Sequence, residues 1–396
     1  MTPEFTLLTE EELGLVMTNL GSDPAQLALK LHGKKHIDRQ KIVQQVLARQ
    51  KAKTKLPDWY SSEQLFFPHP VSVEQASSQA TARYKASLTT GNHLADLTTG
   101  MGIDVFYFSK RFNKVTGYET DAMLASITAR NLAILAALNI EIRNKSGEEP
   151  GPEKPDCIFI DPSRRDAQKR KVAAFEDSSP NILELLPRLA ALTPEIIIKS
   201  SPLVDIDLAI SQLQWVSEVH VLGYQKECKE LAFILKPHIP RQDPLIHAVL
   251  IDDEGIPVRK QVFTRRQEAG CTLSYDEPAG YLYEPHPAFM KAGGFRLIGE
   301  EYGLTKIAAN SHLYSSQELN PDFPGRIFHI EGVTDASRFS PKGWLQEEKA
   351  NLTLRNFPSN PDDLRKKWRL KEGGQDYLFA TTLSSNRKVI ILAKKA

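Results

Sequence analysis

Cysteine is scarce in this sequence, and long apolar runs are absent. The three cysteines, Cys157, Cys228 and Cys271, stand alone without a CxxC pair. We therefore expect neither a disulfide framework nor a cysteine-rich zinc site. The cysteine usage is typical of a protein in a reducing compartment. No stretch approaches the ~20 consecutive apolar residues that a membrane span needs. The N-terminal segment MTPEFTLLTEEELGLVM is acidic and lacks the basic-then-apolar order of a signal peptide. We expect a cytoplasmic protein that does not span a membrane.

An excess of one charge sign is missing as well, since 50 Lys and Arg face 49 Asp and Glu. The balance is uneven along the chain. Residues 326–396 carry 14 basic and 8 acidic side chains, a net +6, and the remainder carries −5. A basic tail is typical of a polyanion partner, although many such tails are only solvated. The ten histidines show no HxxH or HExxH spacing, so no metal is expected.

The length of 396 residues suits two or three domains. Helical periodicity, with caps at Asp23 and Asp38, predicts an N-terminal helical region over residues 1–70. From residue 92, short apolar runs alternate with helical segments, which predicts βαβ units and a parallel sheet over residues 71–240. Its strands are expected at 93–96, 114–118, 140–142, 156–160 and 196–199. A short polar turn between two further runs, at 218–222 and 230–235, predicts an antiparallel pair at the end of this sheet.

Pro237, Pro240 and Pro244 mark the predicted end of this region. Two small α+β domains are predicted beyond them. The first covers residues 241–325, with strands at 247–251 and 258–263. The second covers residues 326–396 and contains a basic helix at 361–368.

A glycine-containing turn, Asp96-Leu-Thr-Thr-Gly100-Met-Gly102, follows the first predicted strand. Glycines allow a ligand to approach the backbone closely, and in open α/β sheets ligands bind beyond the carboxyl ends of the strands. Glu119 directly follows the second strand, where an acid can accept both hydroxyl hydrogens of a ribose. The pattern therefore predicts a site for a nucleotide-like cofactor.

Two cofactors compete for this turn, a dinucleotide and S-adenosylmethionine. The turn lacks the G-x-G-x-x-G order, and Asp96 would repel a pyrophosphate. S-adenosylmethionine has no phosphate and carries cationic groups, so an acidic turn suits it. The antiparallel end of the sheet favours the same choice.

On these residues the chain resembles the class I S-adenosylmethionine-dependent methyltransferases over about residues 70–236. The turn matches their first motif, although Thr98 stands where many members have glycine. The resemblance implies a Rossmann-like seven-stranded α/β sheet. It implies cofactor binding by Asp96, Thr98, Gly100, Gly102, Asp104, Glu119, Thr120 and Glu148.

A narrower resemblance covers nearly the whole chain. It rests on residues 72–85 (SVEQASSQATARYK), the DPSRR motif at 161–165, residues 283–293 (YEPHPAFMKAG) and the block from Asn356 to Phe379. These look like a bacterial family that joins a class I methyltransferase to a ferredoxin-like module and a C-terminal THUMP-like domain. The resemblance implies an RNA substrate.

The DPSRR motif follows the fourth strand, where the resemblance places the catalytic residues. Asp161 and Pro162 fit the Asp/Asn-Pro-Pro-aromatic motif of enzymes that methylate amino groups, but Ser163 and Arg164 replace the second proline and the aromatic residue. An arginine can stack on a base or bind a phosphate, or Arg164 and Arg165 can pair with nearby acids. Candidate substrate contacts are Arg165, Lys169, Arg170 and Lys199.

Cysteine nucleophiles are not favoured, since Cys157 lies inside a predicted strand and Cys228 in a predicted turn. The sequence therefore predicts a methyltransferase that acts on structured RNA, with Asp161 orienting or deprotonating the target and Arg164 positioning it. Two alternatives stay open. One is a methyltransferase for a protein or small molecule, and the other is a non-catalytic RNA-binding protein that retains the cofactor fold.

Overall fold

The computed structural model describes residues 7–151, 153–164, 175, 178–240, 242–345 and 347–396. The chain divides into two compact units. The first comprises Met1–Tyr224, Lys229–Gln242 and Ile251–Val258, and the second comprises Gln225–Cys228, Asp243–Leu250 and Arg259–Ala396.

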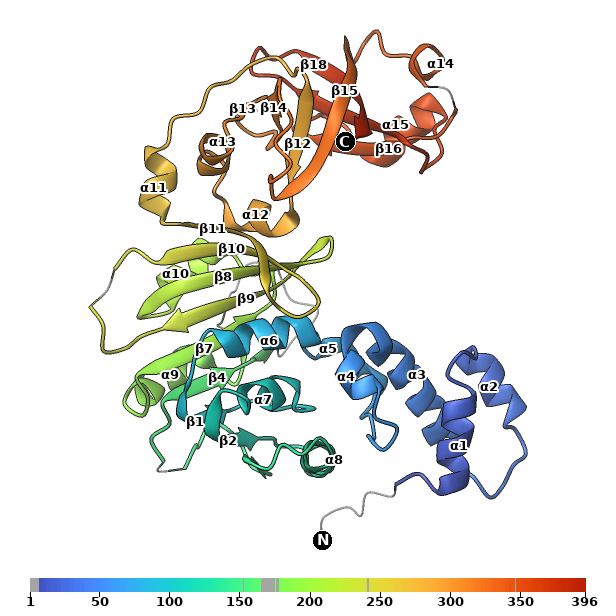
Figure 1. Ribbon diagram of the computed structural model, residues 1–396, viewed down its shortest axis with the longest axis vertical. Helices are drawn as coiled ribbons and strands as arrows, with labels where there is room; N and C mark the ends of the chain where they lie inside the picture. The colour runs from blue at the N-terminus through green and yellow to red at the C-terminus, as the bar shows by residue number, and fades with distance from the viewer. Residues whose placement is uncertain (1–6, 152, 165–174, 176–177, 241, 346) are drawn as a thin grey trace. The chain divides into compact units, whose positions relative to one another are not determined.

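The N-terminal region is helical, as predicted, and its first four helices extend to one side of the sheet of the same unit (Figure 1). Asp23 and Asp38 cap the second and third helices by accepting hydrogen bonds from the backbone N–H groups of Gln26 and Lys41. Both predicted caps are confirmed. The helices are α1 (Glu10–Thr18), α2 (Pro24–Lys30), α3 (Arg39–Lys55), α4 (Pro57–Tyr60), α5 (Pro70–Gln75) and α6 (Gln79–Ser87).

The large sheet has nine strands in the order β11-β10-β8-β9-β7-β4-β1-β2-β3. The strands β1, β2, β3, β4 and β7 pair in parallel, and β9 pairs antiparallel with β7. Parallel strands buried on both faces are apolar throughout, as the buried run Cys157–Ile160 shows. The strands are β1 (Gly91–Asp96), β2 (Phe112–Tyr118), β3 (Ile140–Arg143), β4 (Cys157–Ile160), β7 (Glu195–Ser200), β8 (Val216–Tyr224), β9 (Glu227–Leu235), β10 (Leu245–Ile251) and β11 (Pro257–Phe263).

The order β3-β2-β1-β4-β7-β9-β8 reproduces the predicted seven-stranded arrangement and its antiparallel end. The sheet is longer than predicted, because the segments assigned by sequence to the next domain form β10 and β11. The intervening helices are α7 (Ile103–Phe108), α8 (Ala122–Ile134), α9 (Ile182–Ala190) and α10 (Ile206–Gln212). A small separate hairpin joins β5 (Ser163–Arg164) and β6 (Ser178–Ser179).

The second unit contains a seven-stranded sheet in the order β13-β14-β12-β15-β18-β17-β16. The long strand β15 pairs with β12 on one side and with β18 on the other. The two small domains predicted from sequence therefore share one continuous sheet. The strands are β12 (Tyr281–Pro285), β13 (Thr305–Lys306), β14 (Tyr314–Ser316), β15 (Gly325–Asp335), β16 (Asn351–Arg355), β17 (Asp376–Thr382) and β18 (Lys388–Lys395). The helices are α11 (Arg265–Gly270), α12 (Pro287–Ala292), α13 (Leu297–Glu301), α14 (Pro341–Trp344) and α15 (Pro361–Trp368).

A buried carboxylate links the two halves of this second sheet. Glu284 on β12 is 3% exposed, and it pairs with Arg326 on β15 and Arg355 on β16. Two arginines on one buried carboxylate satisfy its oxygens and connect side chains of three strands.

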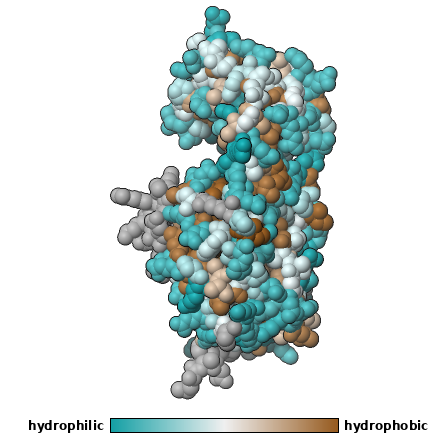
Figure 2. Space-filling model, turned by 90° about the vertical axis from the view of Figure 1, so that its left-hand side faces the viewer, coloured by the Kyte–Doolittle hydropathy of each residue, from teal (hydrophilic) through white to brown (hydrophobic). Residues whose placement is uncertain are grey.

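Hydrophilic residues cover much of the face in Figure 2, with apolar residues among them in patches. Among the described residues, no helix is long and apolar enough to cross a membrane.

Candidate functional site

A pocket of about 440 Å³ lies in the first unit, where β1, β2 and β4 end. This volume is within the range of small-molecule sites in proteins. The carboxyl ends of parallel strands are where an open α/β sheet binds its ligands. Its walls come from the turns after these strands, from residues 146–148, from the hairpin residues Ser163, Ser179 and Pro180, and from Ser72, Gln75, Ala76 and Ser77.

The turn after β1 is built on two glycines in the left-handed region. Gly100 has φ +55° and Gly102 has φ +85°, and Gly102 begins α7. A Cβ on Gly102 would lie 2.7 Å from Cγ2 of Thr128 on α8. The Thr128 hydroxyl donates to the Gly100 carbonyl at 2.9 Å. The turn is therefore held against α8 and keeps its backbone open to the pocket.

Glu119 lines the pocket at the end of β2, as predicted. Its Oε2 accepts the Gly100 N–H at 3.0 Å, and its Oε1 accepts the Asp121 N–H at 2.8 Å. Oε1 also lies 3.5 Å from the Thr120 hydroxyl, which leaves Oε2 with one lone pair to spare because each carboxylate oxygen accepts about two hydrogen bonds. The side chain is thus fixed in place and can still accept hydrogen bonds from a ligand.

The predicted residues Thr98, Asp104, Thr120 and Glu148 also line the pocket. Gly147, which the sequence did not single out, lies between Glu148 and the turn. A Cβ there would lie 2.3 Å from the Leu97 carbonyl oxygen, so only glycine fits. This close approach brings residues 146–148 against the turn.

Asp96, which the sequence predicts to bind the cofactor, is not among the residues that line the pocket. It is 1% exposed, and its Oδ1 accepts the backbone N–H of Thr98 at 2.9 Å. Burial raises its pKa well above the ordinary value, and negative charges on Asp104 and Asp161 add to the effect. Asp96 therefore shapes the turn from inside.

Thr98 connects the glycine turn to the DPSRR motif. Its hydroxyl oxygen accepts the backbone N–H of Asp161 at 2.7 Å. The residue that departs from the usual glycine thus positions the candidate catalytic acid. The Asp161 side chain is 33% exposed and lines the pocket.

Lys199 is nearly buried at the end of β7, where its ammonium forms an ion pair with Oδ2 of Asp161. Burial opposes its charge, but Asp161 and other nearby carboxylates outweigh this and raise the pKa of Lys199 above its ordinary value. The sequence left either a substrate contact or a carboxylate contact open for Lys199, and the structure places its ammonium on the carboxylate of Asp161.

A second buried lysine lies on α6. Lys85 is fully buried, and its Nζ lies 2.5 Å from Oε1 of Glu230 and 3.0 Å from Oδ1 of Asp104. Ser77 accepts a hydrogen bond from Lys85 and donates one to Asp104. Burial raises the pKa of Asp104, but Lys85 and Lys199 overcome this and hold it below the ordinary value. Sequence reasoning missed Lys85 and Glu230 because they are 145 positions apart.

The DPSRR motif is described only in part. Ser163 lines the pocket, and the backbone of Ser163–Arg164 pairs with that of Ser178–Ser179. The predicted substrate contacts Arg165, Lys169 and Arg170 lie outside the described residues.

Two further reactive side chains of the first unit, Cys157 and His220, have contacts that indicate a structural role. Cys157 is buried, and burial raises the pKa of its thiol, so it is poorly suited to act as a nucleophile.

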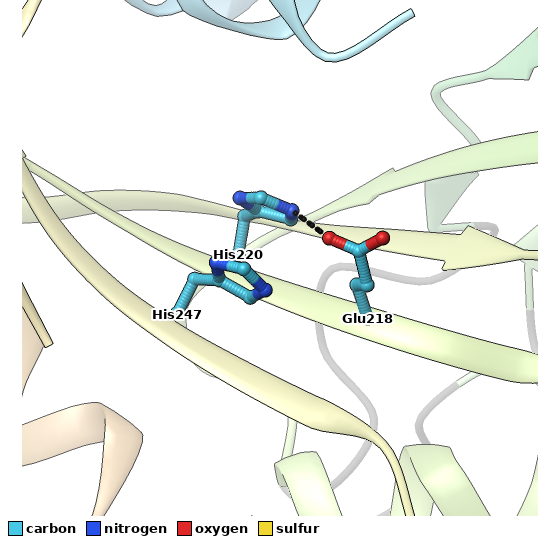
Figure 3. Close-up of side chains that lie close together, drawn as sticks. All are labelled: Glu218, His220 and His247. Carbon is cyan, nitrogen blue, oxygen red and sulfur yellow. Dashed lines mark hydrogen bonds and ion pairs between the residues drawn. The ribbon is translucent and has the colours of Figure 1, made fainter. Parts of the chain in front are cut away.

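His220 lies between two partners. The Tyr84 hydroxyl bonds its Nδ1 at 2.8 Å, and its Nε2 bonds Glu218 at 3.3 Å (Figure 3). These bonds tie α6 to β8.

The sheet order, the glycine turn and the pocket define the fold of a class I methyltransferase. In the second unit, a ferredoxin-like domain family matches residues 281–324, and a THUMP domain-like family matches residues 325–395. The ferredoxin-like match is shorter than the predicted 241–325. The combination of domains expected from the resemblance is confirmed.

The whole chain is similar to the crystal structure of a protein from Porphyromonas gingivalis W83 that is named as a candidate methyltransferase. The identity is 29%, the match covers 99% of this chain and 100% of that one, and the TM-score is 0.83. A smaller part aligns with the Pyrococcus abyssi tRNA (uracil-54, C5)-methyltransferase in complex with S-adenosyl-L-homocysteine, at 20% identity over 44% of this chain and 40% of that one, with a TM-score of 0.32. No curated protein matches the sequence.

Proposed function

We propose that this protein is an S-adenosylmethionine-dependent methyltransferase that acts on structured RNA. The observation that carries the proposal is the charge of the pocket. Among the described residues that line the pocket, four are acids, and there is no lysine, arginine or histidine. The acids are Asp104, Glu119, Glu148 and Asp161. Such a lining suits a cationic ligand without phosphate and opposes a dinucleotide.

The residues present fit the methyl donor at two places. Glu119, anchored by two backbone N–H groups, has a lone pair on Oε2 for a ribose hydroxyl, and a ligand hydroxyl can replace the long contact of Thr120 at Oε1. The glycine turn lets the backbone come close to the ligand, and Glu148 and Asp104 supply negative charge for its cationic groups. When bound, S-adenosylmethionine supplies an electrophilic methyl group.

Asp161 and Ser163 lie where the acceptor would enter. Asp161 is fixed by Thr98 and Lys199, so its carboxylate can orient a hydrogen-bond donor of the target without rearranging. Exclusion of water and alignment of the target are the main contributions expected of the chain.

The proposal of an RNA substrate rests on the second unit. Residues 326–396 carry the net charge of +6, and their family match is THUMP-like. Lys366, Lys367, Arg369 and Lys371 are exposed and form no ion pair within the part of the chain that the structure describes. Exposed cations without internal partners are suited to phosphates.

The test is methyl transfer from labelled S-adenosylmethionine to total RNA from cells that lack this gene. We expect label in RNA with the wild-type protein and its loss with Asp161→Ala. Cofactor binding by calorimetry serves as the control, and it should persist in that variant. Label in protein or small molecules instead of RNA would reject the proposed substrate. Full biological effect of Asp161→Ala and Glu119→Ala variants would favour a non-catalytic RNA-binding protein.

A further inference from the structure

Positive charge is concentrated in the helical region at the start of the first unit. Residues 27–55, which include part of α2 and all of α3, contain nine lysines and arginines and one acid, Asp38. Their net charge of +8 exceeds the +6 of residues 326–396, although the segment is less than half as long. Such a concentration of one charge sign attracts a polyanion where the side chains are exposed and lack partners within the protein.

Packing against α1 determines which of these side chains are exposed. Leu31 after α2 is 2% exposed and Ile42 on α3 is fully buried, and both belong to an apolar cluster with Val16 of α1. The basic residues around the turn between α2 and α3 lie in solvent instead. We call four of these exposed residues the α2–α3 surface: Lys30, Lys34, Lys35 and Arg39.

The protein itself does not neutralise the charges of the α2–α3 surface. Its three lysines form no ion pair within the part of the chain that the structure describes. Arg39 donates a hydrogen bond to Nδ1 of His32 at 2.9 Å. A histidine that accepts at Nδ1 carries no negative charge, so the guanidinium keeps its positive charge. All four cations are therefore available to an anionic partner.

Two acids border the α2–α3 surface, and both have other partners. Asp38 caps α3 through the backbone N–H of Lys41, and its carboxylate lies 3.8 Å from Lys41 Nζ. Glu11 on α1 lies 2.9 Å from the ring of His36. Neither acid forms an ion pair with a residue of the α2–α3 surface among the described contacts.

A buried arginine holds α3 in place. Arg49 is 0% exposed, and it donates hydrogen bonds to the backbone carbonyls of Glu63 at 2.6 Å and Leu65 at 2.8 Å. Gln45, one turn earlier, bonds both the N–H and the carbonyl of Phe67. Buried polar contacts of this kind are costly to break, so α3 and the segment after α4 move as one piece.

The same segment connects α3 to the elements around the pocket. The backbone of Phe66 exchanges two hydrogen bonds with Asn131 on α8, the helix that also holds the glycine turn. Lys51, near the end of α3, forms an ion pair with Glu74 on α5, and α5 contributes two residues to the pocket wall. The position of α3 relative to the pocket is therefore fixed by contacts within the first unit.

The α2–α3 surface lies at the end of α3 that is remote from the pocket wall, as Figure 1 shows for α2 and α5. Arg39 is the first residue of α3, and the contact to α5 is made by Lys51 in its second half. With 17 residues at about 1.5 Å each, α3 is about 25 Å long. A ligand that reaches both places must be extended, which suits a folded RNA and excludes a small molecule.

We propose that the α2–α3 surface binds the phosphate backbone of the RNA substrate, about 25 Å along α3 from the wall of the pocket. The proposal rests on the function proposed above and adds a second RNA contact to that of residues 326–396. Phosphate contacts position a nucleic acid without reading its sequence. The α2–α3 surface therefore sets the affinity for an RNA arm that continues beyond the target nucleotide, and it takes no part in the transfer step.

The first test removes the three lysines together, as Lys30→Gln, Lys34→Gln and Lys35→Gln in one variant. The KM for the RNA that the wild-type protein labels should rise about tenfold, with kcat and cofactor affinity unchanged. In a binding assay, the slope of log Kd against log salt should become shallower by about 2–3, because three phosphates lose their cations.

The control variant loses the same net charge elsewhere in the first unit. It combines three exposed residues that do not line the pocket, and it should keep the wild-type KM and salt dependence: Arg111→Gln, Lys154→Gln and Arg188→Gln. Equal losses in both variants would show a general charge effect and overturn the inference.

The remaining outcomes separate this inference from the proposed function. A wild-type KM and salt slope in the variant of the α2–α3 surface, with label still entering RNA, overturns the inference and leaves the RNA methyltransferase in place. Absence of label in RNA with the wild-type protein overturns both. Unchanged RNA affinity with loss of binding to vesicles that contain anionic lipids would assign the surface to a membrane, which also overturns the inference.

The second test uses the length of the RNA. Fragments of the labelled RNA that end within about 25 Å of the target nucleotide are too short to reach from the pocket to the α2–α3 surface. The wild-type protein and the variant lacking the three lysines should therefore have the same KM on these fragments and differ only on longer ones. An equal difference on short and long RNA would contradict the proposal.

Discussion

The pocket of the first unit and the C-terminal module of the second carry opposite charge. The described lining residues of the pocket include four acids and no basic side chain, and residues 326–396 carry a net +6. The overall charge of +1 conceals this difference. The pocket suits a small cation, and residues 326–396 suit a polyanion. This combination is expected of the proposed RNA methyltransferase, whose methyl donor is cationic.

The pocket depends on buried charge pairs, and these should give the largest effect. Lys85→Met leaves Glu230 and Asp104 without their buried partner, so the free energy of unfolding should fall by about 3–5 kcal/mol. Chemical denaturation would measure the change. Lys53→Met, at an exposed lysine of the same unit, should change it little. Equal stability of both variants would show that the buried pairs do not hold the pocket.

The acidic end of the pocket should lose affinity when Glu119 is removed. Glu119→Ala deletes the acceptor for ribose hydroxyls and releases the Gly100 N–H, so cofactor affinity should weaken by about 2 kcal/mol, roughly 30-fold. Calorimetry with S-adenosylmethionine measures this. Glu149→Ala, at an exposed acid that does not line the pocket, should retain wild-type affinity. Equal losses in both variants would point to a general charge effect.

The link between the two ends of the pocket can be tested at Thr98. Thr98→Val removes the oxygen that accepts the Asp161 N–H while keeping the shape of the side chain. We expect kcat to fall by about tenfold, near 1.4 kcal/mol, with a smaller effect on cofactor affinity. Thr98→Ser keeps the hydroxyl and should restore most of the rate. A serine variant as slow as the valine variant would assign the effect to packing.

The basic module should show the smallest effect per residue. Lys366→Gln with Lys367→Gln should weaken RNA binding by about 1 kcal/mol, roughly fivefold. The salt dependence of log Kd should become shallower by about 0.7–0.9 for each phosphate that the variant no longer neutralises. Cofactor affinity should not change, because both residues lie in the other unit. An unchanged salt dependence would remove this helix from the RNA surface.

The residues at the glycine-turn end of the pocket could be brought together from sequence because their signals are local. Gly100 and Gly102 stand in a turn directly after a strand, and Glu119 follows the next strand. A turn after one strand and an acid after the next strand lie within about twenty residues of each other, so their spacing can be recognised in the sequence alone. The antiparallel end of the sheet was equally accessible, since two apolar runs flank a short polar turn.

The remaining features depend on interactions between distant segments. Lys85 and Glu230 form a buried pair across 145 positions, and no periodicity marks a charged residue that will be buried. Thr98 was noted as a departure from the family pattern, but its bond to the Asp161 backbone is visible only in three dimensions. Asp96 was predicted to bind the cofactor, and the sequence did not indicate that its carboxylate would be buried and accept the Thr98 N–H.

The full extent of each sheet was also beyond the sequence pattern. Prolines near residue 240 predicted the end of the sheet, but β10 and β11 extend it. Strand β15 joins the two small modules into one sheet, since it pairs with strands on both sides. Strand pairing is fixed by tertiary packing, and sequence periodicity reports only that a strand exists.

Calorimetric titration of the wild-type protein with S-adenosylmethionine and, separately, with a nicotinamide dinucleotide tests the central claim most directly. The acid-lined pocket predicts saturable binding of S-adenosylmethionine, weakened in Glu119→Ala, and no binding of the dinucleotide. Binding of the dinucleotide without binding of S-adenosylmethionine would contradict the account.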